Sequence, residues 1–263
     1  MDDRLVFAEQ TARKAGELLL KYFNPNGMRT RSKADQSVVT EADLASDRWI
    51  TAQIHENFPD ETVLSEELHT ELASGSKNTQ AVWVIDPLDG TTNFSLGLHY
   101  WGILIARLED GFPNIAALFF PLLDEMYTTQ KDAGARLNGR RIQTKPPEKN
   151  QTAAFFSCCS RTFQNYHVSV PYKTRILGSA AYTFCCVARG AAVLGFEATA
   201  KIWDIAGAWL VAAEAGAIVE TLDGSSPFPL SAGVDYSQRS FPCLVASTSH
   251  VAHRARRQIL PRR

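Results

Sequence analysis

The sequence lacks the features that mark membrane, secreted and nucleic-acid-binding proteins. No run of 18 apolar residues occurs among its 263 residues, so it predicts no membrane-spanning helix and no membrane partner. The first twenty residues mix charged and apolar side chains, unlike a signal peptide. With 27 basic and 28 acidic residues, the formal net charge is -1, which gives no electrostatic reason to expect binding to nucleic acid.

Cysteine is scarce, and its spacing excludes a disulfide framework and a zinc motif. The five cysteines form two adjacent pairs and one single residue: Cys158, Cys159, Cys185, Cys186 and Cys243. Because each lies in an apolar segment, we expect buried and reduced thiols, and therefore a cytoplasmic location.

Apolar periodicity predicts a first half that contains helices followed by strands. Helical spacing covers residues 4–22 and 43–57. The segment VWVID, residues 82–86, reads as a short buried strand that ends at Asp86 and is stopped by Pro87. Three further strands within residues 102–130 predict an antiparallel meander.

The second half alternates between strands and helices, which predicts layers of the two. The expected strands are 152–159, 174–177, 192–197, 217–221 and 242–247, and the expected helices are 179–189, 204–215 and 248–258. Residues 145–151, with two prolines among polar residues, are the best linker candidate. We therefore predict an N-terminal α+β domain over residues 1–148 and a C-terminal α/β domain over residues 149–263.

The strongest functional signal is the segment WVIDPLDGTTNF, residues 83–94. A buried strand would deliver Asp86, and a tight turn between Pro87 and Gly90 would bring Asp89 beside it. Two carboxylates this close repel each other unless a cation lies between them, and oxygen ligands suit Mg²⁺. A helical turn after Gly90 would direct free N–H groups at an anion. The segment therefore predicts a metal site beside a phosphate site, although an Asp-Pro-x-Asp-Gly string alone also fits a capped turn.

This segment resembles the signature of the inositol monophosphatase family, and three other segments extend the resemblance from about residue 33 to 220. They are VTEAD (39–43), VLSEE (63–67) and WDIAGA (203–208), the last followed by EAGA (214–217). Ser65 stands where the family usually has glycine. The resemblance implies an α+β fold, the layered αβαβα sandwich of the inositol monophosphatase and fructose-1,6-bisphosphatase type, and a homodimer.

The resemblance also implies roles for individual residues, with two or three Mg²⁺ ions as cofactors. Metal ligands would be Glu66, Asp86, the Leu88 carbonyl, Asp89 and Asp204, with Glu67 supporting a weaker site through water. Catalytic residues would be Glu66 and Thr91, which activate water, and Asp43, which orients the Thr91 hydroxyl. Substrate contacts would come from Asp89, Gly90, Thr91, Gly178, Ser179, Ala180, Glu197 and Asp204.

Simpler interpretations exist for several of these residues. Glu66 and Glu67 could form an exposed acidic turn, and Asp43 and Asp204 could be plain helix caps. Glu197 could lie at an exposed strand end.

The substrate class rests on Glu197, which matches the position where inositol-preferring members carry a glutamate. A carboxylate there favours a polyol, so a phosphorylated polyol or sugar, and first inositol 1-phosphate, is the expected substrate. Against this, Lys201 near the metal site, with Arg161, Lys173 and Arg175, could accept a second phosphate. Fructose 1,6-bisphosphate and 3′-phosphoadenosine 5′-phosphate would suit such a site, and histidinol phosphate is a further alternative that the sequence leaves open.

Two rival functions are consistent with the same residues. Some family members act as regulatory binding proteins for the transcription machinery, so catalysis could be vestigial. Alternatively, the carboxylates could hold a metal that only stabilises the fold. An active enzyme of this family would be expected to be sensitive to lithium.

Overall fold

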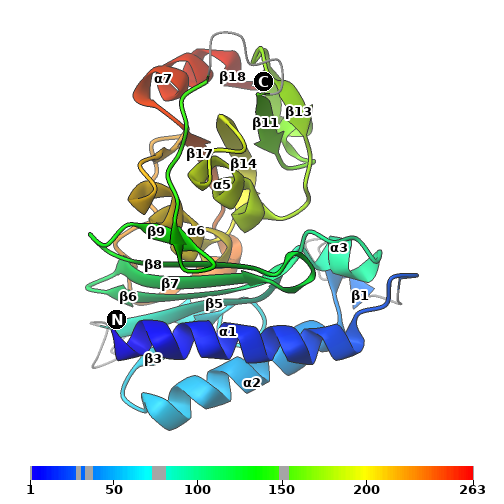
Figure 1. Ribbon diagram of the computed structural model, residues 1–263, viewed down its shortest axis with the longest axis vertical. Helices are drawn as coiled ribbons and strands as arrows, with labels where there is room; N and C mark the ends of the chain where they lie inside the picture. The colour runs from blue at the N-terminus through cyan, green and yellow to red at the C-terminus, as the bar shows by residue number, and fades with distance from the viewer. Residues whose placement is uncertain (1, 28–30, 33–37, 73–80, 148–153, 263) are drawn as a thin grey trace.

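The computed structural model describes residues 2–27, 31–32, 38–72, 81–147 and 154–262 as five stacked layers (Figure 1). Helices α1 (Asp3–Tyr22) and α2 (Glu41–Asn57) lie against a seven-stranded sheet, and α5 (Ala180–Ala188) and α6 (Ile202–Glu214) lie between it and a five-stranded sheet. Helix α7 (Ser249–Gln258) covers the outer face. This αβαβα order confirms the predicted fold class.

The seven-stranded sheet is antiparallel except at one edge, and it confirms the predicted meander. Its strand order is β10 (Arg140–Arg141), β9 (Ala135–Leu137), β8 (Glu125–Gln130), β7 (Phe112–Phe120), β6 (Gly102–Glu109), β5 (Ala81–Asp89) and β3 (Thr62–Ser65), with β3 parallel to β5. Alternate residues of β5 face opposite layers: Trp83 and Ile85 pack with α1 and α2, whereas Val82 and Val84 pack with α5 and α6. Both faces are therefore buried, which explains the continuous apolar run.

The five-stranded sheet combines parallel and antiparallel pairs. Its order is β13 (Lys173–Arg175), β11 (Phe155–Cys158), β14 (Leu194–Ala200), β17 (Phe241–Ala246) and β15 (Ile218–Thr221). Strand β11 is parallel to both neighbours, and the other pairs are antiparallel. The remaining elements are short: β1 (Arg31–Ser32), β2 (Val38–Val39), β4 (Glu71–Leu72), α3 (Thr91–Ser95), α4 (Thr162–Asn165), β12 (Tyr166–Val168), β16 (Val234–Asp235), β18 (Ile259–Pro261) and the 3-10 turns Pro121–Leu123 and Tyr236–Gln238.

The prediction that Pro87 stops the strand at Asp86 is wrong, because β5 continues to Asp89. Asp86 pairs with Leu104 and Asp89 pairs with Gly102, so the register shifts between the two aspartates. Proline has no N–H to give to a ladder, and an irregularity of this kind is where a strand tolerates it. The expected domain boundary near residue 148 lies outside the described residues.

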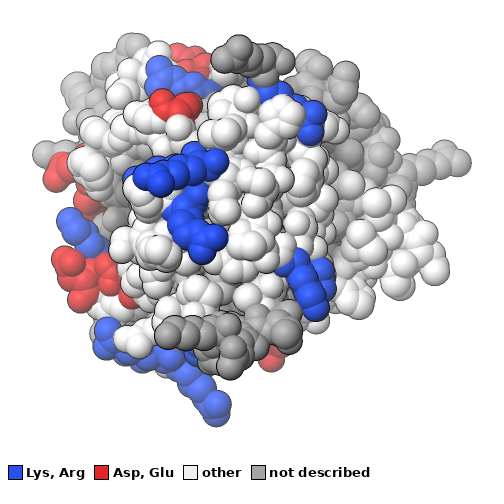
Figure 2. Space-filling model, turned by 90° about the horizontal axis from the view of Figure 1, so that it is seen from above, with Lys and Arg blue, Asp and Glu red and all other residues white. Residues whose placement is uncertain are grey.

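The surface seen from above carries its charges in separate groups. On this face, which holds α7 and the edge of the five-stranded sheet, Lys and Arg form small groups set among uncharged side chains, and some lie beside acidic ones (Figure 2). Among the described residues, no helix combines the length and apolarity needed to cross a membrane.

Candidate active site

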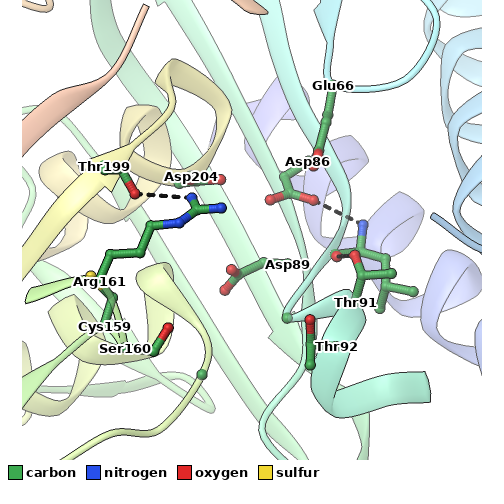
Figure 3. Close-up of a pocket in the computed structure, with 13 residues that line it drawn as sticks. Glu66, Asp86, Asp89, Thr91, Thr92, Cys159, Ser160, Arg161, Thr199 and Asp204 are labelled. Carbon is green, nitrogen blue, oxygen red and sulfur yellow. Dashed lines mark hydrogen bonds between the residues drawn. The ribbon is translucent and has the colours of Figure 1, made fainter. Parts of the chain in front are cut away.

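A cavity of about 280 Å³ lies where the end of β5 meets the C-terminal half of the chain (Figure 3). Three acidic ligand candidates come from two elements, since Asp86 and Asp89 end β5 and Asp204 lies in the first turn of α6. The cavity is lined by Glu66, Asp86, Leu88, Asp89, Gly90, Thr91, Thr92, Cys159, Ser160, Arg161, Gly178, Thr199 and Asp204. The structure thus brings together most of the residues that the sequence singled out.

The carboxylates of this cavity lie close enough to share a metal ion. Asp86, Asp89 and Asp204 each offer an oxygen within 4.8 Å of the others. Burial raises the pKa of Asp86 well above its usual range, and repulsion from Glu66, Asp89 and Asp204 adds to the effect. Burial likewise raises the pKa of Asp89 to about 6 and of Asp204 to about 8. A hard cation would offset this repulsion, so the donor set fits Mg²⁺.

Asp204 combines the two roles that the sequence left as alternatives. One of its carboxylate oxygens, Oδ2, accepts a hydrogen bond from the N–H of Lys201 at 2.8 Å, so it caps the start of α6. Together with Asp86 and Asp89, the same side chain forms a group of three carboxylates, which we call the acidic cluster. Capping therefore fixes the carboxylate that faces Asp86 and Asp89.

The N-terminus of α5 holds Asp89. The Ser179 hydroxyl donates to Asp89 Oδ2, and the N–H groups of Ala180 and Ala181 donate to its Oδ1 and Oδ2 at 3.1 and 3.2 Å. The Ser179 hydroxyl and the Ala180 N–H thus contact this carboxylate, and the expected contacts of the two residues with substrate stay a prediction. Of the loop 178–180, only Gly178 lines the cavity.

Gly90 adopts a left-handed conformation, with φ of 84°, and begins the short helix α3. The Thr91 hydroxyl lies 3.0 Å from both Asp43 Oδ1 and the Leu88 carbonyl oxygen. Asp43 Oδ2 accepts from the N–H and the hydroxyl of Thr40, which is the capping box of α2. Burial raises the pKa of Asp43. Asp43 therefore acts as a helix cap and also contacts Thr91, as the resemblance implied.

Glu67 and Glu197 do not line the cavity. The N–H of Glu67 donates to Asp47 Oδ2 at 3.2 Å. Glu197 is buried, with 4% of its surface exposed. Burial raises its pKa to about 8, a hydrogen bond with Thr183 opposes this shift, and repulsion from Asp89 and Asp204 adds to it. The role of Glu197 toward a ring hydroxyl stays a prediction.

Among the four basic residues considered for a second phosphate, Arg161 alone lines the cavity. Its guanidinium donates to the Thr199 hydroxyl at 3.2 Å (Figure 3). Lys201 instead donates to the Ser237 carbonyl at 2.6 Å. The strand β13 carries Lys173 and Arg175 outside the cavity wall.

Sequence reasoning missed the wall formed by Cys159, Ser160 and Thr199. The first two follow the end of β11, and Thr199 lies near the end of its parallel neighbour β14. Carboxyl ends of parallel strands meet at one edge of a sheet and commonly carry a binding site. The predicted strands ended near these residues, so this signal was present.

Comparison with known proteins gives consistent matches along the chain. The profile described as "Inositol monophosphatase family" matches residues 1–258. A protein named Nus factor SuhB from Pasteurella multocida is 32% identical over 241 residues, covering 87% of this chain and 88% of that protein. The Escherichia coli K12 protein of the same name is 31% identical over 245 residues, covering 89% and 91%.

Solved structures agree with this assignment. The IMPase of Thermotoga maritima superposes with a TM-score of 0.78 at 26% identity, covering 97% of this chain and 96% of that one. The extragenic suppressor protein suhB of Bartonella henselae gives a TM-score of 0.81 at 23% identity, covering 98% of each, which supports the fold alone. This chain belongs to the inositol monophosphatase family.

Proposed function

We propose that the protein is a magnesium-dependent phosphatase that hydrolyses inositol 1-phosphate to inositol and phosphate. One observation carries the proposal: Asp86, Asp89 and Asp204 converge in a cavity that Glu66 and Thr91 also line. Family membership supports phosphate-ester hydrolysis with a metal cofactor.

The proposed metal ligands are the acidic cluster with Glu66 and the Leu88 carbonyl, and Glu67 would act at a third site through water. A bound divalent cation would neutralise phosphate charge and would acidify the attacking water. Asp89 is held by three donors from the start of α5, so its carboxylate has one fixed orientation. A carboxylate that is already held in place loses less conformational entropy when the ion binds, and this favours a well-defined coordination geometry.

The attacking water would be held by Glu66 and Thr91. The Thr91 hydroxyl has one proton, and both Asp43 and the Leu88 carbonyl lie at donating distance from it. Donation to Asp43 leaves the lone pairs of the hydroxyl oxygen to accept a hydrogen bond from water. Asp43 is therefore a positioning residue, and Gly90, Thr91 and Thr92 would provide the N–H groups that bind the phosphate.

A second candidate is a substrate that carries another anionic group, such as fructose 1,6-bisphosphate or 3′-phosphoadenosine 5′-phosphate. Arg161 favours it, because a guanidinium at the cavity wall matches a phosphate oxygen pair. Glu197, the residue expected to favour a polyol, is not among the residues that line the cavity.

The test is phosphate release from inositol 1-phosphate, fructose 1,6-bisphosphate, 3′-phosphoadenosine 5′-phosphate and histidinol phosphate, with Mg²⁺ or with a chelator. We expect release only with Mg²⁺, and a loss of at least about 100-fold in kcat/KM for Asp204→Asn. Asp223→Asn, an exposed carboxylate in a turn outside the cavity, serves as the matched control. No release from any ester by the unaltered protein would refute the proposal.

A regulatory binding role is the alternative from another class, because the relatives above carry the name Nus factor. Asp89→Asn would separate the two roles in a pull-down from lysate. Retained partners with lost turnover would assign the binding to a surface other than the acidic cavity.

The proposal also includes a homodimer, a cytoplasmic location, two domains that meet near residue 148 and inhibition by lithium. Analytical ultracentrifugation would test the first of these, and phosphate release in lithium chloride would test the last.

A further inference from the structure

Helix α2 buries a polar stripe where a core helix normally buries apolar side chains. Asp43, Ser46 and Asp47 are spaced i, i+3 and i+4, so they share one face of the helix. Their exposed fractions are 1%, 0% and 0%. Burying a carboxylate or a hydroxyl costs free energy unless the group forms hydrogen bonds. The hydrogen-bond partners of these three side chains therefore indicate why the stripe is polar.

Each member of the stripe contacts a different segment of the candidate active site. Asp43 Oδ1 accepts from the Thr91 hydroxyl at 3.0 Å. The Ser46 hydroxyl donates to the Pro87 carbonyl at 3.0 Å, and Asp47 Oδ2 accepts from the Glu67 N–H at 3.2 Å. One face of α2 therefore contacts three places that carry ligand or catalytic candidates: the end of β5, the start of α3 and the loop after β3.

The Ser46 contact falls inside the irregularity of β5. The Pro87 carbonyl lies between Asp86 and Asp89, where the register with β6 shifts. A shifted ladder leaves backbone groups to be satisfied by other partners, and here the Ser46 hydroxyl is one such partner. This contact fixes the backbone between the two aspartates.

The Asp47 contact fixes the backbone beside Glu66. On one side, the N–H of Glu66 donates to the Ile85 carbonyl at 3.3 Å, and on the other, the N–H of Glu67 donates to Asp47. The second oxygen of Asp47 accepts from the Thr51 hydroxyl at 3.1 Å, one turn further along α2. The Asp47 carboxylate is thus oriented by a hydrogen bond within α2 as well as by its hydrogen bond to the Glu67 backbone.

We propose that Ser46 and Asp47 are positioning residues, which hold the β5 irregularity and the Glu66 backbone in a fixed relation to Thr91. This inference rests on the proposed function, because it concerns the geometry of the same metal site. In this arrangement α2 sets the separation between the ligand-bearing segments, and neither residue contacts substrate.

The test uses Asp47→Ala, Asp47→Asn and Ser46→Ala in the full chain, with Ile54→Val as the control. Ile54 is a fully buried core residue of the same helix and takes part in none of the three hydrogen bonds, so its truncation destabilises α2 packing but leaves those bonds in place. Two properties are measured in the substrate-free protein: hydrogen exchange of the Glu67 amide without metal, and Mg²⁺ affinity by calorimetric titration.

Asp47→Ala should speed exchange of the Glu67 amide by about 10- to 100-fold and raise the Mg²⁺ dissociation constant by about tenfold, as expected for loss of a hydrogen bond to a charged acceptor. Ser46→Ala, which removes a neutral hydrogen bond, should raise that constant by about threefold. Asp47→Asn keeps an acceptor and should give intermediate values. Ile54→Val should lower the unfolding temperature and leave both properties at their unaltered values.

Unaltered amide exchange and unaltered Mg²⁺ affinity in Asp47→Ala would overturn the inference, as would equal effects from Ile54→Val. If Asp47→Ala does not fold, Asp47→Asn and Ser46→Ala decide by the same two measurements. If the unaltered protein neither binds Mg²⁺ nor releases phosphate, the proposed function fails, while the amide exchange still decides whether Asp47 holds the loop.

Discussion

Acidification should weaken Mg²⁺ binding steeply, because the ligands bind protons in competition with the metal. The perturbation is a change from pH 8 to pH 6 in the substrate-free protein. Burial and mutual repulsion raise the pKa of Asp204 to about 8 and burial raises that of Asp89 to about 6, so both gain protons across this range. Carboxylates bind Mg²⁺ in their ionised form, so each proton gained opposes the metal.

The magnitude follows from these two pKa values. Over this range the ionised fraction of Asp204 falls about 50-fold and that of Asp89 falls about twofold, so Mg²⁺ affinity should fall about 100-fold. Below pH 7 the slope of log affinity against pH should approach one proton from Asp204 and should steepen as Asp89 begins to titrate.

Calorimetric titration at several pH values, in buffers with different ionisation enthalpies, measures the affinity and the protons released together. Asp204→Asn removes the group with the higher pKa and should flatten the profile between pH 7 and pH 8. An affinity that stays constant from pH 8 to pH 6, with no proton release, would refute the reasoning.

Three further outcomes follow from other contacts. Arg189→Met leaves the Glu125 carboxylate, whose side chain is 16% exposed, without its cation. Chemical denaturation should show that the fold loses about 3 kcal/mol of stability. The double variant Arg189→Met, Glu125→Gln should recover part of that loss. Gly178→Ala places a Cβ 2.7 Å from Asn93 Oδ1 at a φ of +77°, and should lower the unfolding temperature and phosphate release together. Because the acidic cluster has pKa values above those of the unfolded chain, the folded state binds more protons between pH 4 and pH 8, so metal-free stability should fall as pH rises and Mg²⁺ should restore it in thermal unfolding.

The periodic elements of this fold could be predicted because their signals are local. Helices α1 and α2, the meander and the alternating second half all have apolar spacing that a single segment reveals. The proximity of Asp86 and Asp89 was also predictable, since only Pro87 and Leu88 separate them. Asp204 lies more than a hundred residues away, and the resemblance alone placed it beside them.

Long-range pairing of short strands could not be predicted. Strand β12 pairs Tyr166 with Pro261, and β16 pairs Val234 with Leu72. Two or three residues carry no readable period, and their partners are fixed by the packing of larger elements. The cavity wall shares this limitation, because it depends on which strands become neighbours.

The irregularity in β14 near Glu197 is a further feature that could not be predicted from the sequence. Its strand pairs Glu197 with Cys243 and Ala200 with Phe241, so the register shifts just before the cavity edge. One extra residue exchanges the faces on which following side chains lie. Thr199 lines the cavity, whereas Glu197 is not among its lining residues, and no pattern in the sequence marks the irregularity.

The acidic cluster limits which parts of the chain can be exchanged with those of a relative. Asp86 and Asp89 belong to the seven-stranded half, whereas Asp204 and the α5 donors to Asp89 belong to the other half. A chimera that exchanged one half for that of a relative would keep the complete cluster only if the new half reproduced the packing of α5 and α6. Neither half alone contains the whole cluster, so an exchange that preserves it has to match the two halves to each other.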